Sequence, residues 1–336
     1  MPLSFGLWYD FRNPTPWRRP WQRLYQETLE QVAWADSLGF DSVWLSEHHF
    51  TDDGYLPALL PMLAALAMRT SHMRLGTAVL LAPLHHPLRL AEDAAVVDVL
   101  SGGRLELGLA PGYRAEEFAL LGVRRAERGR RTDETIEIVK AAWTARPFSY
   151  RGRCFQFEDV VVTPPPLQHP HPPIWVGGSS PASAKRAARH GCHFLPDASA
   201  PADLYQLYRT ELAANGHDAA PFRVATSRAV YVCEDPERGW REVQEHYLYM
   251  ANRYRQWYAA GNAERPKRPL ERADELSRGD YLVGTPEMVA SEISQLREAL
   301  PFDRLIFWAR PPGLSVESSS RSLELFAQQV LPHFAT

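Results

Sequence analysis

The chain alternates short, continuous apolar runs with longer segments in which apolar residues recur every three or four positions. A continuous apolar run is typical of a strand buried on both faces, whereas the longer spacing predicts an amphipathic helix. Eight such runs predict strands, at Leu3–Tyr9, Ser42–Leu45, Met73–Leu81, Arg104–Leu109, Ile174–Gly177, His193–Leu195, Phe222–Cys233 and Arg304–Trp308. The alternation predicts an α/β protein with parallel strands.

One stretch, residues 73–112, carries this pattern most clearly. Leu90, Ala94 and Val97 fall on one helical face, between an apolar run at Leu75–Leu81 and a second at Leu105–Ala110. A Ser-Gly-Gly triplet separates that helix from the second run. Strand, helix and strand in about 40 residues form a βαβ unit, whose strands are parallel.

Eight strands interleaved with helices predict a (β/α)8 TIM barrel, and we expect it to form a single domain over residues 1–336. A barrel of this kind needs about 250 residues, so insertions are expected. Residues 146–173 predict a β-hairpin followed by a proline-rich crossing. Residues 253–280 are polar and charged and predict a long mobile loop, of the kind that often serves as a lid.

Charge and cysteine content exclude several classes of protein. The formal net charge of -3 gives no electrostatic reason to expect nucleic acid or an anionic membrane as partner. The three cysteines are too few and too widely spaced for a disulfide framework or a zinc motif. The chain has neither a secretory apolar core at its start nor an apolar run long enough to span a membrane. We therefore expect a soluble cytoplasmic protein.

The carboxyl ends of the predicted strands supply candidate site residues, because barrels of this type carry their active sites there. Trp8, Tyr113 and Trp308 lie at such ends and favour an apolar or aromatic substrate, although core packing explains them equally well. Glu47 and His48 follow the second strand. The neutral imidazole of His48 suits a donor or a general base, and Glu47 is expected either to orient His48 or to neutralise an arginine.

A glycine-serine segment at residues 177–183 leaves a strand and opens a helix. Free backbone N–H groups at such a helix start can cradle an anion, although small residues also suit a plain tight turn. Arg131 could supply a positive charge from the other side. It lies in an arginine-rich stretch, residues 124–131, which is either a solvated helix start or part of an anion site.

A catalytic metal is not expected. The pairs His85–His86 and His169–His171 are the candidate ligands. A metal-dependent hydrolase on this fold would spread histidines and a carboxylate over several strand ends, whereas the fifth and eighth strands end in Gly/Ser and Trp/Arg.

Four segments together give the chain a family resemblance: FDSVWLSEHHF at 40–50, the βαβ unit at 74–112, HPPIWVGGSSPASAKRAARHG at 171–191 and LVGTPEMVASEI at 282–293. In this order they resemble the bacterial luciferase-like flavin monooxygenases. The resemblance implies a (β/α)8 barrel that takes reduced FMN from a separate flavin reductase. It also implies reaction with O2, through a C4a-peroxyflavin, to oxygenate a small organic substrate in a dry cavity.

The resemblance also implies roles for particular residues. It places the catalytic histidine on His48 and a non-proline cis peptide between Ala78 and Val79, beneath the flavin ring. It assigns the flavin phosphate to Arg131, with Arg128 and Arg130 as alternatives. The backbone phosphate loop falls on Gly178, Ser179 and Ser180. One departure is that Ala110 and Pro111 stand where the luciferase catalytic subunit has a reactive cysteine and an arginine, so light emission is not inferred.

Three functions remain open on the sequence. The first is a two-component monooxygenase that uses reduced FMN. The second is a deazaflavin-dependent hydride-transfer enzyme of the same superfamily, although Glu47-His48-His49 favours the FMN branch. The third is a non-catalytic flavin-binding subunit. The resemblance also leads us to expect a homodimer.

Overall fold

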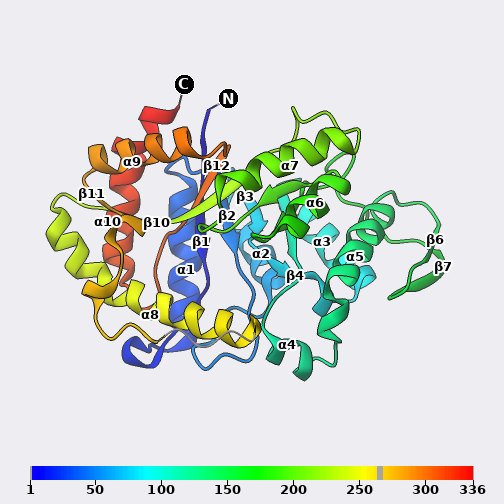
Figure 1. The fold of residues 1–336 in the computed structure, drawn as a ribbon, viewed down its shortest axis with the longest axis horizontal. Coiled ribbons are helices and arrows are strands. Elements are labelled where there is room, and N and C mark those ends of the chain that lie inside the picture. Colours follow the sequence, from blue (N-terminus) through cyan, green and yellow to red (C-terminus); the bar gives the residue numbers. More distant parts are fainter. Residues whose placement is uncertain (1, 263–267, 336) are drawn as a thin grey trace.

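The computed structural model describes residues 2–262 and 268–335 and shows one large, curved parallel sheet with helices packed around it (Figure 1). Along the sheet the strands follow the order β11-β10-β12-β1-β2-β3-β5-β8-β9, and β4 pairs with β5. Every pairing in this sheet is parallel. An isolated parallel bridge joins Phe194 of β9 to Val224, just before β10.

The strands of the sheet are β1 (Ser4–Tyr9), β2 (Ser42–Leu45), β3 (Arg74–Thr77), β4 (Leu80–Leu81), β5 (Leu105–Ala110), β8 (Ile174–Gly177), β9 (His193–Leu195), β10 (Ala225–Val232), β11 (Tyr281–Gly284) and β12 (Arg304–Trp308). The helices are α1 (Trp21–Asp36), α2 (Leu59–Ala67), α3 (Pro87–Leu100), α4 (Ala115–Leu120), α5 (Arg128–Ala142), α6 (Pro181–Arg189), α7 (Ala202–Ala214), α8 (Pro236–Asn262), α9 (Pro286–Ala299) and α10 (Val316–Leu325).

All eight predicted strands occur, with two differences. The predicted strand at residues 73–81 is divided into β3 and β4, with Ala78 and Val79 between them. The sequence analysis missed β11, although its short apolar run directly precedes the Thr285-Pro286 start of α9. The predicted βαβ unit is confirmed, because α3 connects β3 and β4 to the parallel strand β5.

The core lies where the strands meet the surrounding helices. Every residue of β2, β5 and β8 is buried, as expected for strands that are covered on both faces. Among the described helices, none combines the length and the apolar character that crossing a membrane requires. Because these strands are packed on both faces, the sheet forms a rigid base. The loops at the carboxyl ends of its strands can therefore hold side chains in fixed positions.

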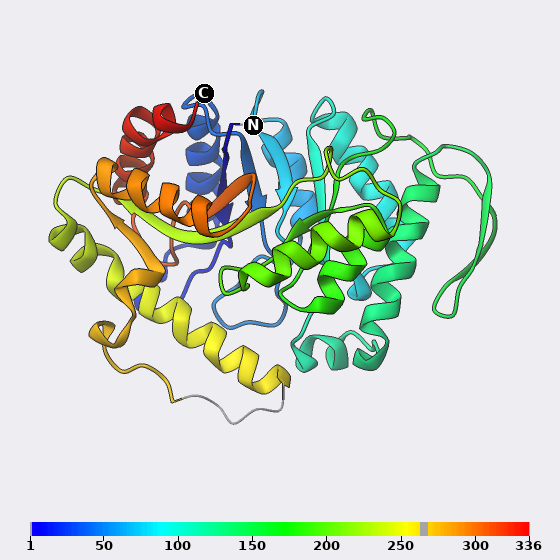
Figure 2. The same ribbon diagram turned by 45° about the horizontal axis from the view of Figure 1, so that its top comes forward.

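The predicted hairpin at 146–173 is confirmed. Strands β6 (Phe148–Arg151) and β7 (Gln156–Val160) form a separate antiparallel pair, which projects from the body beside α5 (Figure 1). The prediction of a long loop from residue 253 is partly wrong, because α8 continues to Asn262 and crosses the carboxyl ends of the strands (Figure 2). Tyr254, Trp257 and Tyr258 recur at helical spacing, and the rings of Trp257 and Tyr258 both contact that of Tyr254, which favours a helix over this stretch. Residues 263–267 of the predicted lid lie outside the described part.

Candidate active site

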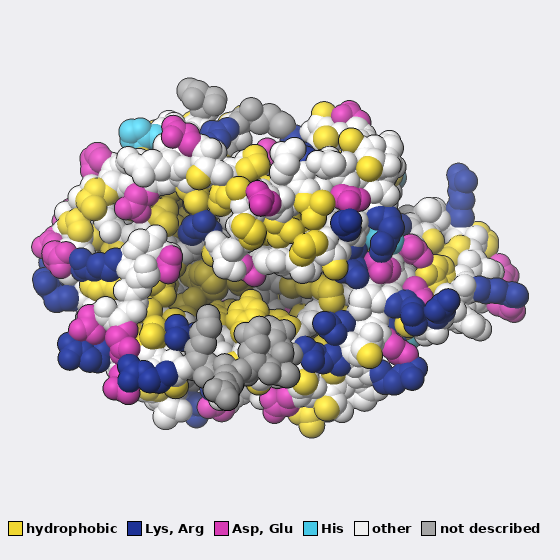
Figure 3. All heavy atoms as spheres, in the orientation of Figure 1, with side chains coloured by type: hydrophobic (Ala, Val, Ile, Leu, Met, Phe, Trp, Pro, Cys, Tyr) yellow, Lys and Arg dark blue, Asp and Glu magenta, His cyan; other side chains and the backbone are white. Residues whose placement is uncertain are grey.

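A cavity of about 700 Å³ opens at the carboxyl ends of the strands. Residues of α5, α6 and α8 line it. Near the centre of the face in Figure 3, hydrophobic side chains line a hollow bordered on one side by lysine or arginine side chains. Segments after β2, β5 and β8 contribute to its wall. The predicted residues that line it are Trp8, Glu47, His48, Ala78, Val79, Tyr113, Gly178, Ser179 and Ser180.

His48 is held in one orientation by a carboxylate. Its Nδ1 lies 2.8 Å from Oε1 of Glu117, which also accepts the backbone N–H of His49 and a guanidinium N–H of Arg114. Because the carboxylate can only accept, Nδ1 of His48 carries the hydrogen and Nε2 is left as the acceptor. The hydroxyl of Tyr113 lies 3.3 Å from Nε2. With Nδ1 as the donor, Nε2 accepts the hydroxyl of Tyr113, and both side chains line the cavity.

Burial lowers the pKa of His48, and the hydrogen bond to Glu117 and its negative charge partly oppose this effect. The imidazole is therefore neutral near pH 7, and it gains a proton only when the pH falls below the usual pKa of histidine. Sequence reasoning missed Glu117. The only local signal for Glu117 is its position in the first turn of α4, the helix that follows the fourth predicted strand. This signal is weak, because glutamates are common in the first turns of helices.

Replacing Glu117 with glutamine is expected to lower the pKa of His48 further. The substitution keeps the shape of the side chain but removes the charge that favours the protonated ring. An NMR titration of the His48 ring measures this directly, without a substrate. Glu116→Gln is the matched control, because Glu116 also pairs with Arg114 but does not contact His48. An unchanged or higher pKa of His48 in Glu117→Gln would contradict this account.

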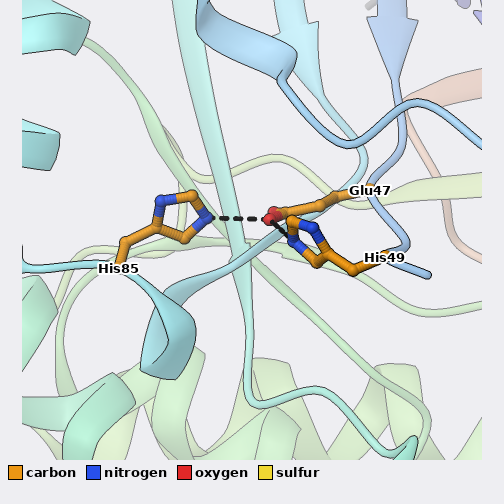
Figure 4. A group of neighbouring side chains, drawn as sticks. All are labelled: Glu47, His49 and His85. Atoms are coloured by element: carbon orange, nitrogen blue, oxygen red, sulfur yellow. Dashed lines mark hydrogen bonds and ion pairs between the residues drawn. The ribbon is translucent and has the colours of Figure 1, made fainter. Parts of the chain in front are cut away.

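Among the described residues, the partners of the Glu47 carboxylate are His49, His85 and the backbone of Leu81, so neither His48 nor an arginine is its partner and both alternatives from the sequence are wrong. Its Oε1 lies 2.6 Å from Nε2 of His49 and 2.8 Å from Nε2 of His85, as Figure 4 shows. Its Oε2 accepts the backbone N–H of Leu81 at 2.6 Å. Burial alone would raise the pKa of Glu47, but the charge of His85 and the two histidine hydrogen bonds lower it to about 2. Glu47 therefore ties the end of β2 to β4.

Glu47, His49 and His85 also form a group that could hold a metal ion. Each offers one ligand atom, and these atoms lie within 4.8 Å of one another. Two imidazoles and a carboxylate are a donor set that Zn²⁺ accepts. Here the three side chains hydrogen-bond to one another (Figure 4). The sequence analysis weighed His85 with His86 as candidate ligands and did not bring these three residues together.

The segment from Gly177 to Ser180 forms a small corner of the cavity at the start of α6. Ser180 caps α6 by accepting the backbone N–H of Ser183 at 3.2 Å. Gly178 has a φ of +128°, and a Cβ there would lie 2.5 Å from Oγ of Ser183. A Cβ at Gly177 would meet Val79 at 2.6 Å. The corner thus needs glycine at both positions and leaves room for a ligand beside the helix start.

Arg131 does not lie at this corner, which corrects the sequence assignment. Its Nε donates to the carbonyl of Pro83 at 3.1 Å, and its guanidinium covers the ring of Phe155, 4.6 Å from the centroid. Arg128, which the sequence kept as an alternative, lines the cavity together with Arg186. Tertiary packing explains the difference. Arg131 lies about one helical turn after Arg128, and its side chain packs on Phe155 of the hairpin insertion instead of facing the cavity.

Arg128 and Arg186 place positive charge at the cavity. Burial lowers the pKa of Arg128, and the nearby positive charges of Arg125 and Arg186 lower it further. Arg186 is compensated by Asp133, whose Oδ1 lies 2.8 Å from its Nε. In the described part of the chain, the structure shows no ion pair for Arg128. The positive charge of the half-buried Arg128 favours an anionic ligand at this edge of the cavity.

The peptide between Ala78 and Val79 is cis, as the resemblance implies. Both residues line the cavity and stand between β3 and β4. Their side chains pack with Trp44 and Trp175 in a small apolar cluster below the cavity. This segment forms a firm apolar floor.

Aromatic side chains form much of the remaining wall. Trp8 lines the cavity, whereas Trp308 stacks behind it with ring centroids 4.0 Å apart and is not a lining residue, which corrects its assignment to the substrate pocket. Tyr113 stacks on Tyr258 of α8, with centroids 4.6 Å apart. Both of these tyrosines line the cavity. Sequence reasoning missed Tyr258, because it placed the α8 stretch in a loop.

Arg12 is a third residue that the sequence did not reveal. Its side chain is completely buried, with Nε 3.3 Å from Oδ2 of Asp10. The guanidinium lies over the rings of Tyr55, Tyr254 and Trp257, at 4.4, 4.8 and 5.1 Å from their centroids. Arg12 therefore connects α8 to the loop that follows β1, directly behind the cavity wall.

Comparison with known proteins agrees with this geometry. The model of the luciferase-like monooxygenase family matches residues 5–303. The oxygenase component of the flavin-dependent trigonelline monooxygenase of Acinetobacter baylyi is 28% identical over 332 residues, which cover 94% of this chain and 91% of that protein.

Solved structures agree as well. Monooxygenase RslO1 of Streptomyces bottropensis superimposes with a TM-score of 0.86 at 30% identity, covering 98% of this chain and 99% of that one. The oxygenating constituent of the 3,6-diketocamphane monooxygenase of Pseudomonas putida, solved with FMN, has the same fold, with a TM-score of 0.81 at 23% identity and 99% of both chains covered. The match over nearly the whole chain shows that this protein belongs to the luciferase-like monooxygenases, a family of flavin-dependent enzymes.

Proposed function

We propose that this enzyme is the oxygenase component of a two-component system. It would receive reduced FMN from a separate flavin reductase and use O2 to oxygenate a small apolar or aromatic substrate. One observation carries the proposal: a single cavity joins an anion-accepting corner, a neutral buried histidine and an aromatic wall. The expected homodimer, single domain and cytoplasmic location remain predictions.

The residues present fit FMN. Ser179, Ser180 and Arg128 would hold the phosphate, through backbone N–H groups at the helix start and a positive charge. Gly178 would let the phosphate approach closely, while its own N–H donates to the carbonyl of Leu195 at 3.2 Å. The volume of about 700 Å³ is large enough for a cofactor and a small substrate together. The apolar floor at Ala78 and Val79 would support the ring system. When bound, reduced FMN supplies the electrons that activate O2.

The protein's own contribution is a dry, oriented site. The aromatic wall excludes water, which protects reactive species from side reactions. Nε2 of neutral His48 can accept a proton from a reacting group, and Glu117 keeps that tautomer. Glu47 keeps the segment at Leu81 beside the floor.

We also propose that the sheet closes into the complete (β/α)8 barrel. The support is the parallel bridge between Phe194 and Val224 and the hydrogen bond from the N–H of Phe194 to the carbonyl of Arg223 at 3.1 Å. These contacts connect β9 to the start of β10, the two strands between which a ring would have to close.

Oxygen uptake with each reduced cofactor tests the function. We expect the enzyme with reduced FMN to consume O2 and to release hydrogen peroxide more slowly than free reduced FMN does, as followed by stopped-flow absorbance and a peroxide assay. Tight binding of a reduced deazaflavin without oxygen uptake would contradict the proposal and favour hydride transfer. Binding of flavin with no effect on its reoxidation would favour a non-catalytic subunit.

Replacing Arg128 with alanine is expected to weaken FMN binding by about 10- to 100-fold, because a charge-assisted hydrogen bond contributes roughly 1.5–3 kcal/mol. Arg131→Ala is the matched comparison, since Arg131 covers Phe155 and lies outside the cavity. We expect it to change the dissociation constant by less than about threefold, as measured by quenching of flavin fluorescence. The reverse order of the two effects would restore the sequence assignment of Arg131.

A further inference from the structure

A chain of hydroxyl groups runs through the cavity wall. Nε1 of Trp8 donates to Oγ of Ser46 at 2.7 Å. Oγ of Ser46 lies 2.5 Å from the hydroxyl of Tyr55, which lies 3.1 Å from the hydroxyl of Tyr254. These four residues all line the cavity. Trp8 belongs to β1, Ser46 and Tyr55 lie in the segment after β2, and Tyr254 belongs to α8. The fold thus brings together four polar groups that are far apart in the sequence.

Counting protons shows that this chain has one hydrogen-bond donor to spare. Ser46, Tyr55 and Tyr254 carry three hydroxyl protons, and the two links between them use two. The indole N–H of Trp8 can only donate, so it occupies one acceptor position of Ser46. The third proton therefore belongs to whichever of the three hydroxyls does not donate within the chain. Ser46 and Tyr55 are buried, with 4% and 2% of their surface exposed, whereas Tyr254 is partly exposed, so we place the spare proton on Tyr254.

The surroundings keep the two phenols as donors. Burial raises the pKa of Tyr55 and of Tyr254, so both are protonated at neutral pH. The guanidinium of Arg12 lies behind both rings and favours negative charge on their oxygens. A phenol oxygen becomes more negative as it donates its proton, so the charge of Arg12 strengthens this donor. The two hydrogen bonds between these hydroxyls suffice to connect α8 to the segment after β2. The spare proton of Tyr254 is not needed for that connection.

Flat aromatic surfaces face the same cavity. Trp8 presents an indole that Trp308 backs at a centroid distance of 4.0 Å. Tyr113 and Tyr258 form a second stacked pair, with an interplanar angle of 11°. Rings of this kind prefer to pack against other planar rings. A bound molecule would therefore meet planar apolar faces and one directed donor.

Building on the proposed function, we propose that Ser46, Tyr55 and Tyr254 form the subsite that anchors the substrate. Tyr254 donates a hydrogen bond to an exocyclic carbonyl oxygen of a flat-ring substrate. The substrate class is thus a planar or aromatic compound that carries a hydrogen-bond acceptor, rather than a plain hydrocarbon.

A matched pair of probes tests the subsite without turnover. 2-Acetylnaphthalene and 2-ethylnaphthalene have nearly the same shape, but only the first has an acceptor oxygen. Their dissociation constants are measured by calorimetry with the full chain, with and without oxidised FMN. The variants are Tyr254→Phe and, as the matched control, Tyr258→Phe, which removes a hydroxyl from the same cavity outside the chain of hydroxyls.

We expect Tyr254→Phe to weaken binding of the ketone by about three- to tenfold, the effect of one neutral hydrogen bond, and to change binding of the hydrocarbon by less than about twofold. Tyr258→Phe should leave the ratio of the two affinities unchanged. Equal loss for both probes, no loss for the ketone, or no binding of either probe to the unmodified protein would overturn the proposal. If FMN fails to bind while the ketone shows the expected loss, the proposed function fails and the subsite stands.

Discussion

Replacing His48 with alanine is expected to reduce formation of oxygenated product by about 10²- to 10⁴-fold, the usual contribution of a positioned acid or base. His48 is buried at the cavity, its Nδ1 is held by Glu117, and its Nε2 is an acceptor that lies 3.3 Å from the hydroxyl of Tyr113. Alanine leaves nothing in its place that can accept or donate a proton. Affinity for FMN should stay within about threefold, because His48 lies outside the Gly-Ser corner and the arginine pair.

The measurement is the ratio of oxygenated product to hydrogen peroxide under single turnover with reduced FMN, using a substrate found by screening planar ketones. Oxygen uptake should continue in His48→Ala, but with hydrogen peroxide as its main product. His86→Ala is the control, since His86 is exposed and lies against the hairpin ring of Phe157. Unchanged turnover in His48→Ala would remove His48 from the mechanism.

Replacing Arg12 with methionine is expected to lower the free energy of unfolding by about 3–5 kcal/mol, the range for breaking a buried ion pair from one side. The substitution leaves Asp10 and Asp53, both buried, without the cation between them. It also removes the charge that lies over three aromatic rings, two of them on α8. We expect α8 to lose protection from hydrogen exchange before the sheet does.

Urea unfolding followed by circular dichroism measures the change. Arg23→Met is the control, because Arg23 is 73% exposed and pairs with Glu27 on the surface, where such a pair contributes at most about 1 kcal/mol. Adding Asp10→Asn to Arg12→Met should recover part of the loss, since it removes one uncompensated charge. A loss below about 1 kcal/mol, or strictly additive effects in the double variant, would show that Arg12 is not a buried electrostatic link.

Sequence reasoning located most of the cavity because its residues follow local signals. Apolar runs mark the strands, and the residues directly after them include His48 and the Gly177–Ser180 corner. Arg131 and Trp308 were misplaced for a related reason. A position near a strand end or helix start places a side chain within a few ångströms of the cavity, but small rotations decide whether it lines the cavity or packs behind it.

Longer-range partners could not be predicted. Glu117 reaches His48 across 69 positions, and Tyr254 reaches Tyr55 across 199. Polar residues such as these are common on helix surfaces, and nothing local distinguishes those that turn inward. The stretch at 253–262 was assigned to a loop because it is rich in charge, whereas its aromatic residues pack on the cavity wall and keep it helical.

The sequence by itself determined the order of strands and helices, the parallel sheet and the positions of the histidine and glycine-serine segments. These follow from side-chain periodicity and from turn chemistry, which act over a few residues. Only the tertiary structure decided which arginine faces the cavity, which carboxylate holds His48 and how Arg12 joins α8 to the sheet. Those choices depend on burial and on contacts between distant segments, which exist only after the sheet has curved and α8 has packed across it.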